Sequence, residues 1–259
     1  MSVVTSRQHP MVKQCRAILR GDDARLLLDG WHLLGDALAA GLPIGWVAVA
    51  RKDTATERAV LDRAAAAGAR ILEVTGEVLD AMSPVRSASG VVAVSDRPSV
   101  DPRALLAPAP ALVLAALGVQ DPGNVGALVR SADAAGATGV LLDEQAADPW
   151  SWKALRASMG STFRLPVLRE ASAIDRLRAW QHDGIRVIAT DPHDGVAMYA
   201  LGLTGPLVLV LGGEGAGLPA SVLTLSDARV RVPMRPRVES LNVAVAAALL
   251  VYEAARQRA

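Results

Sequence analysis

Short apolar runs alternate along the whole chain with longer stretches in which apolar residues recur at helical spacing. The clearest run, residues 207–211, is too short for a helix and is flanked by turn formers, which is typical of a strand buried on both faces. Further strands are predicted at residues 26–28, 46–50, 70–75, 91–94, 111–117, 139–142, 164–168, 186–190 and 229–233. Helices are predicted from about residue 11 and at residues 31–40, 56–67, 125–135, 150–159, 174–182 and 243–256. This alternation predicts a layered α/β fold.

Four prolines between residues 98 and 110 divide the chain into two regions. Their spacing prevents a regular helix, so residues 97–110 are predicted to form a linker. Residues 1–96 are then a small α/β domain, and residues 111–259 are a second, larger one. Each region is long enough to bury its own hydrophobic core.

Composition narrows the classes of protein only slightly. Hydrophobic residues make up 51% of the chain, which excludes a disordered protein, and the net charge of +1 neither requires nor excludes a nucleic-acid partner. The first 25 residues carry a local excess of basic over acidic side chains. That cluster could contact an acidic partner, or it could simply be the solvated face of a helix.

Several kinds of protein are not expected. Cys15 is the single cysteine and the four histidines lack ligand spacing, so we expect no metal site. The apolar run at residues 243–251 is well short of the roughly 20 residues that cross a bilayer, and the N-terminus lacks a signal pattern. We therefore expect a cytoplasmic protein that does not enter a membrane.

A glycine-rich corner follows the strand at residues 207–211. Its glycines at positions 212, 213, 215 and 217 allow positive φ and close approach of a ligand to the main chain. Leu218-Pro219 stands where a phosphate-binding P-loop needs Lys-Ser/Thr, and the G-x-G-x-x-G dinucleotide pattern also fails. Taken alone, the corner could be a simple turn between a strand and a helix.

Two further segments give the corner a chemical context. The corner reads G-G-E-G-x-G-L, and residues 232–246 read V-P-M-x-x-x-V-E-S-L-N-V-x-V-A. Earlier in the chain, residues 121–127 read D-P-G-N-V-G-A and are followed by Arg130. With these three segments in this order, the chain resembles the SpoU/TrmH family of RNA ribose 2′-O-methyltransferases.

The resemblance implies a fold, a cofactor and an assembly. It implies an α/β trefoil knot of the SPOUT type, which general topology rules alone would never suggest. It also implies a homodimer, for which the apolar face of the helix at residues 243–252 is a candidate surface, and S-adenosylmethionine as the methyl donor. The implied cofactor-binding residues are Leu211, Gly212, Gly213, Val232, Met234 and Leu241.

The resemblance also implies a set of polar catalytic residues, namely Asn124, Arg130, Glu214, Ser240 and Asn242. Three of them have simpler readings. Arg130 could extend to solvent from its helix, Glu214 could stabilise a helix start, and Ser240 could cap the last helix. If Arg130 is catalytic, it could activate the 2′-hydroxyl, or it could hold a phosphate and neutralise the developing alkoxide while another group takes the proton. The pKa of arginine, above about 12, makes it a poor base.

The N-terminal region resembles the RNA substrate-binding domain that often accompanies this family's catalytic domain. The resemblance rests on T-S-x-x-x-P-x-V-K at residues 5–13 and L-L-L-D-G-x-x-L-L at residues 26–34. The candidate RNA-binding residues are Arg7, Lys13, Arg16, Arg25 and Arg156.

The chain departs from the family pattern at two positions. Asp29 stands in place of glutamate in the N-terminal region, and Pro236 stands in place of glycine in the C-terminal region. The second departure puts cofactor affinity in doubt.

The sequence therefore predicts methyl transfer from S-adenosylmethionine to a ribose 2′-hydroxyl of RNA. Because a recognition domain is present, we expect ribosomal RNA of the 23S type as the substrate. Transfer RNA is the first alternative. A non-catalytic RNA-binding factor that keeps the fold is the second.

Overall fold

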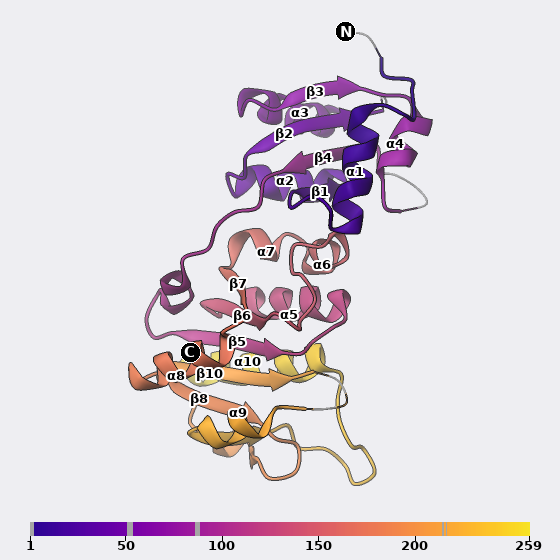
Figure 1. Cartoon of the computed structure of the whole chain (residues 1–259). Coiled ribbons are helices and arrows are strands. Elements are labelled where there is room, and N and C mark those ends of the chain that lie inside the picture. Colours follow the sequence, from indigo (N-terminus) through magenta and orange to yellow (C-terminus); the bar gives the residue numbers. More distant parts are fainter. Residues whose placement is uncertain (1–2, 51–53, 86–88, 214, 216) are drawn as a thin grey trace. The chain divides into compact units, whose positions relative to one another are not determined.

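The structure, a computed structural model, describes residues 3–50, 54–85, 89–213, 215 and 217–259. It divides into two compact units (Figure 1). Unit 1 comprises Met1–Ser99 and Trp150–Phe163, and unit 2 comprises Val100–Pro149 and Arg164–Ala259. Each unit has its own sheet and its own buried core.

Unit 1 is built on a mixed sheet with the strand order β1-β4-β2-β3. β4 runs antiparallel to β1 and β2, whereas β3 runs parallel to β2 and forms an edge. The strands are β1 (Leu26–Asp29), β2 (Ile44–Val49), β3 (Arg70–Glu73) and β4 (Val91–Ser95). The helices are α1 (Pro10–Arg20), α2 (Trp31–Ala39), α3 (Ala55–Ala66), α4 (Gly76–Met82) and α6 (Trp152–Ser158).

Helices cover both faces of this sheet. α1 and α4 bury Met11, Val12 and Met82 on one face, whereas α2 and α3 pack on the other. Local signals set the limits of α1, and the helix starts where the sequence predicts. Pro10 occupies its first turn, and the chain leaves the helix through Gly21 at φ +84°.

The segment Trp150–Phe163, which the sequence assigns to the second domain, groups with unit 1. Leu155 is fully buried in the core of unit 1, and Trp150 and Phe163 pack against the same core with their ring centroids 6.2 Å apart. Burial of these three apolar side chains explains the grouping, because each removes a large apolar surface from water.

Unit 2 contains a seven-stranded sheet with the order β7-β6-β5-β10-β8-β11-β9, and every described pairing in it is parallel. The strands are β5 (Leu112–Leu117), β6 (Gly139–Asp143), β7 (Val167–Glu170), β8 (Arg186–Thr190), β9 (Val196–Ala197), β10 (Leu207–Gly212) and β11 (Ala228–Arg231). The central strands β5 and β10 are almost wholly buried, as their unbroken apolar runs predict.

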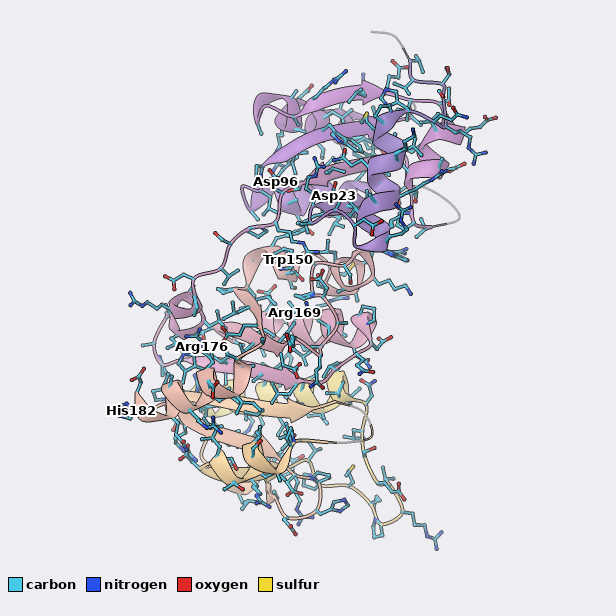
Figure 2. The ribbon with its side chains drawn as sticks, in the orientation of Figure 1. Asp23, Asp96, Trp150, Arg169, Arg176 and His182 are labelled. Carbon is cyan, nitrogen blue, oxygen red and sulfur yellow. The ribbon has the colours of Figure 1, made fainter. Side chains whose placement is uncertain are left out.

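The helices of unit 2 also cover both faces of its sheet. α5 (Pro122–Ala134) and α10 (Val243–Arg258) pack on one face, and α8 (Ala173–His182) and α9 (Ala220–Leu225) pack on the other. Shorter helical turns are α7 (Ser161–Arg164), η1 (Pro102–Leu106) and η2 (Met198–Ala200). One ion pair lies at the edge of the sheet. Arg176 of α8, labelled in Figure 2, binds both carboxylate oxygens of Glu170 at the end of β7, at 2.8 and 3.0 Å.

The structure confirms the α/β fold and differs from the sequence predictions at several places. The predicted linker includes η1, which packs on unit 2 with Leu105 fully buried against Gly139. The strand predicted at residues 164–168 begins only at Val167, since the preceding residues form α7. The sequence did not predict α4, α9 or β9. No helix in the described part of the chain is long and apolar enough to span a bilayer.

Candidate active site

A cavity of about 560 Å³ lies in unit 2 where β8, β10 and β11 end. Ligands in open parallel sheets bind at the carboxyl ends of the strands, and this volume lies within the usual range of about 300–1,000 Å³ for small-molecule sites. The wall is formed by the loops that follow these strands and by the first turns of α10.

All six residues predicted to bind the cofactor line this one cavity. Leu211 and Gly212 end β10, Gly213 begins the glycine corner, and the others come from the loop between β11 and α10. These six are Leu211, Gly212, Gly213, Val232, Met234 and Leu241. Segments about 20 residues apart in sequence therefore meet around one space, with apolar side chains and glycine backbone facing it.

Close backbone packing requires two of the glycines. A Cβ atom at Gly213 would collide with the carbonyl of Gly118, in the loop after β5, and one at Gly212 would collide with the backbone of Gly217. Gly217 itself has φ +65°, a conformation that side chains disfavour. The glycine corner is thus folded tightly on itself and against the loop that leads to α5, and this leaves its main chain accessible to the cavity.

Asn124 and Asn242, the two asparagines among the predicted catalytic residues, meet directly. Asn242 donates from Nδ2 to Oδ1 of Asn124 at 3.0 Å. Oδ1 of Asn242 accepts from the backbone N–H groups of Ala244 and Val245, at 3.0 and 3.3 Å, so Asn242 is the N-cap of α10. The reading of Ser240 as the cap is therefore wrong. Ser240 is exposed and lines the cavity.

Of the other catalytic candidates, Asn124, Asn242 and Arg130 are not among the described residues that line this cavity. Arg130 is exposed on α5. Glu214 lies outside the described residues. The geometry therefore unites Asn124 with Asn242 and places Ser240 at the cavity, and it leaves the roles of Arg130 and Glu214 as predictions.

The sequence missed one wall of the cavity, formed by residues 190–193 after β8. Asp191 accepts from the backbone N–H groups of Asp194 and His193, both at 3.0 Å, and pairs with Arg229 at 3.2 Å. Chiefly the N–H of Asp194, with help from His193 and Arg229, lowers the pKa of the Asp191 carboxyl. A fixed anion therefore stands beside the cavity. One sequence signal could have identified this wall, namely the polar residues that directly follow a predicted buried strand.

Comparison with known proteins decides the family. A model of the SpoU rRNA Methylase family matches residues 111–252, a span that contains all three segments and the whole cavity. The chain belongs to this family. The resemblance inferred from the three segments is thereby confirmed.

Relatives of this SpoU family member align over almost the entire chain. An uncharacterized tRNA/rRNA methyltransferase of Synechocystis is 37% identical over 98% of this chain and 94% of its own. The solved AdoMet-bound rRNA methyltransferase of Sinorhizobium meliloti has a TM-score of 0.87 and 31% identity, covering 98% of this chain and 97% of its own. A solved RNA 2′-O ribose methyltransferase has a TM-score of 0.84 and 34% identity, covering 99% of each chain.

The residues predicted to contact the RNA of this SpoU methylase all lie in unit 1 and are exposed. They are Arg7, Lys13, Arg16, Arg25 and Arg156. Arg25 is less available than the sequence suggests, because its Nε and Nη2 bind Asp23 at 2.6 to 3.2 Å. That hydrogen bond lowers the pKa of Asp23 to about 2, so the pair is ionised and its charges cancel at neutral pH.

Proposed function

We propose that the protein transfers a methyl group from S-adenosylmethionine to a ribose 2′-hydroxyl of RNA, and that the RNA is ribosomal, of the 23S type. One observation carries the proposal. All six residues that the family resemblance assigns to the cofactor line one cavity at the carboxyl ends of parallel strands. The similarity to an RNA 2′-O ribose methyltransferase over 99% of both chains supports ribose as the acceptor.

The cavity supplies the kind of surface that an adenosine-containing sulfonium needs. Backbone amides and carbonyls of the glycine corner, Val232 and Leu241 are available to recognise the base and ribose of the donor. Apolar side chains such as Leu211 and Met234 exclude water from it. The protein then aligns the methyl group with the acceptor oxygen, which converts a bimolecular reaction into an effectively unimolecular one.

The acceptor oxygen needs help because a ribose hydroxyl is barely acidic at neutral pH. In the proposal, Arg130 holds the adjacent phosphate and stabilises the alkoxide as it forms, since its guanidinium stays protonated. Asn124 and Asn242 fix the position of the α5 and α10 starts beside the cavity through their hydrogen bond. Ser240 at the cavity and Glu214 are the candidates for contacting the reacting groups or taking the proton.

We further propose a homodimer in which the partner completes the site. Val245, Leu249 and Tyr252 are 49, 39 and 53% exposed at positions i, i+4 and i+7 of α10, so they form one apolar stripe. α5, which carries Arg130, packs beside α10. A two-fold interface over this face is self-complementary, and it offers Arg130 of one chain to the cavity of the other.

Mixing two inactive variants tests the shared site. Arg130→Ala and Met234→Arg should each abolish methylation when present alone. The first removes the group that stabilises the acceptor oxygen, and the second blocks the cofactor cavity. If Arg130 acts on the partner's cavity, mixed dimers recover activity at one of their two sites. Absence of recovery in dimers proved to be mixed would refute the shared site.

Nucleoside analysis tests the reaction itself. Purified protein, radiolabelled S-adenosylmethionine and ribosomal RNA should yield 2′-O-methylated nucleosides, whereas label on a base would refute ribose as the acceptor. Ribose methylation should then be mapped across total RNA from cells with and without the protein. Loss of a mark in 23S RNA is the expected result. Loss in transfer RNA would support that substrate instead, and no difference anywhere would support a non-catalytic RNA-binding factor.

A further inference from the structure

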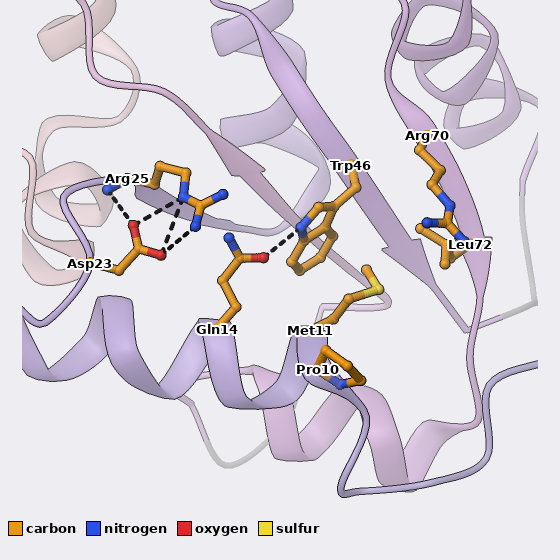
Figure 3. Close-up of a pocket in the computed structure, with 8 residues that line it drawn as sticks. All are labelled: Pro10, Met11, Gln14, Asp23, Arg25, Trp46, Arg70 and Leu72. Atoms are coloured by element: carbon orange, nitrogen blue, oxygen red, sulfur yellow. Dashed lines mark hydrogen bonds and ion pairs between the residues drawn. The ribbon is translucent and has the colours of Figure 1, made fainter.

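A second cavity lies in unit 1, on the sheet face that α1 covers (Figure 3). Its volume is about 370 Å³, which is in the lower part of the range for small-ligand sites, about 300–1,000 Å³. Figure 3 shows Trp46 of β2 in the middle of the lining residues, with Met11 of α1 below its ring and Leu72 of the edge strand β3 to its right. It shares no described lining residue with the cavity of unit 2.

The position of the Trp46 ring is fixed from α1. Its indole Nε1–H donates to Oε1 of Gln14 at 2.9 Å, so the polar edge is satisfied within the protein. The side chain is half-buried and packs against the apolar core under α1. Only 3% of the chain is aromatic, so an indole that opens onto a cavity is a scarce stacking surface here. Stacking on such a ring suits any nucleobase, because every base has a π-face.

The charge of the cavity is set by one arginine. Asp23 and Arg25 both line the cavity, but they bind each other and their charges cancel. Arg70 is exposed and is paired in register with Trp46 across β2 and β3. Its guanidinium makes no hydrogen bond or ion pair with the residues that the structure describes. The cavity therefore combines an apolar floor, one flat ring and one uncompensated guanidinium, a group well suited to phosphate.

We propose that this cavity binds one unpaired nucleotide of the RNA substrate, with its base on Trp46 and an adjacent phosphate on Arg70. The inference rests on the proposed function, because that function makes RNA the substrate. A paired base cannot offer its face to a side chain, so the bound segment is single-stranded. The cavity recognises the presence of an unstacked base rather than its identity, and it holds a nucleotide other than the one whose ribose is methylated.

Binding of a labelled oligonucleotide tests the proposal. The full-length protein, without S-adenosylmethionine, is titrated into fluorescein-labelled hexauridylate and followed by anisotropy over a series of salt concentrations. Arg70→Ala should weaken binding and reduce the slope of log K against log salt by about 0.7, the value for one phosphate contact on a single strand. Trp46→Leu, which keeps apolar volume but loses the ring face, should weaken binding about 5- to 150-fold.

Arg58→Ala is the matched control, because Arg58 is also exposed but lies on α3, on the opposite face of the sheet. Its affinity and salt slope should equal those of the unmodified protein. The proposal is overturned if Arg70→Ala leaves both quantities unchanged, if Arg58→Ala reduces them equally, or if hexauridylate within a duplex competes as well as the single strand.

Thermal melting checks that each variant is folded. If Trp46→Leu unfolds, the comparison of Arg70→Ala with Arg58→Ala still tests the nucleotide site. Both of these substitutions change exposed side chains and should leave the protein folded. Failure of this inference is separable from failure of the proposed function. If binding depends on Trp46 and Arg70 but no methyl transfer occurs, the proposed reaction is refuted and the nucleotide site is retained. If methyl transfer occurs but Arg70→Ala binds RNA normally, the nucleotide site is refuted and the proposed reaction is retained.

Discussion

Asn242 is predicted to serve stability and catalysis through different atoms, and two substitutions separate them. Its Oδ1 caps α10, and its Nδ2 donates to Asn124. Asn242→Ala loses both contacts, whereas Asn242→Asp keeps the cap oxygen and loses the donor. Removing a side-chain N-cap costs about 1 kcal/mol, and a carboxylate at that position interacts favourably with the helix dipole.

The expected results differ between the two assays. In urea denaturation, Asn242→Ala should lower the free energy of unfolding by about 1 kcal/mol, whereas Asn242→Asp should leave it within about 0.5 kcal/mol of the unmodified protein. In methyl-transfer assays, both variants should lose most of their kcat/KM, because both lose the link between the starts of α5 and α10. Normal activity in Asn242→Asp, with an unchanged free energy of unfolding, would refute a catalytic role for the Asn124–Asn242 contact.

Three further predictions concern the same unit. Leu105→Ala should lower the free energy of unfolding by about 2–5 kcal/mol in chemical denaturation, because η1 buries Leu105 fully; a change below 1 kcal/mol would mean that residues 97–110 are only a linker. Gly213→Ala should abolish calorimetric binding of S-adenosylmethionine by forcing the corner away from Gly118, whereas Gly205→Ala, which meets nothing within 4 Å, should bind normally. Asp191→Asn should destabilise the protein more at pH 7 than at about pH 3, because a carboxyl with a lowered pKa contributes stability above about pH 3.9 and loses it as pH falls through the folded pKa. Equal destabilisation at both pH values would show that the ionised carboxylate of Asp191 does not contribute this stability.

The sequence predicted those elements whose signal is local and strong. β10 lies within a residue of its predicted limits, and the proline-initiated α1 starts within a residue of its predicted start. α4 and α9 were missed because they have only seven and six residues and lack a side-chain cap. Such short helices depend on tertiary packing rather than on propensity.

Long-range packing explains the other errors. Nothing near Leu155 in the sequence indicates that it is buried with residues from the first hundred positions. The wall at residues 190–193 was missed because local patterns do not reveal strand order, and only the placement of β8 between β10 and β11 brings it to the cavity. The six residues predicted to bind the cofactor could be grouped from the sequence because the family resemblance, unlike periodicity, carries information about which distant segments meet. They line one cavity in the structure.

Ultraviolet cross-linking of radiolabelled S-adenosylmethionine, followed by tryptic peptide mapping, tests the central claim most directly. Trypsin leaves most of the cavity wall in three peptides, residues 187–229, 232–237 and 238–256, and releases residues 230–231 as a dipeptide. If the cavity in unit 2 holds the methyl donor, label should appear in these three peptides and be displaced by excess unlabelled cofactor. Displaceable label confined to peptides from residues 1–96 would contradict the account.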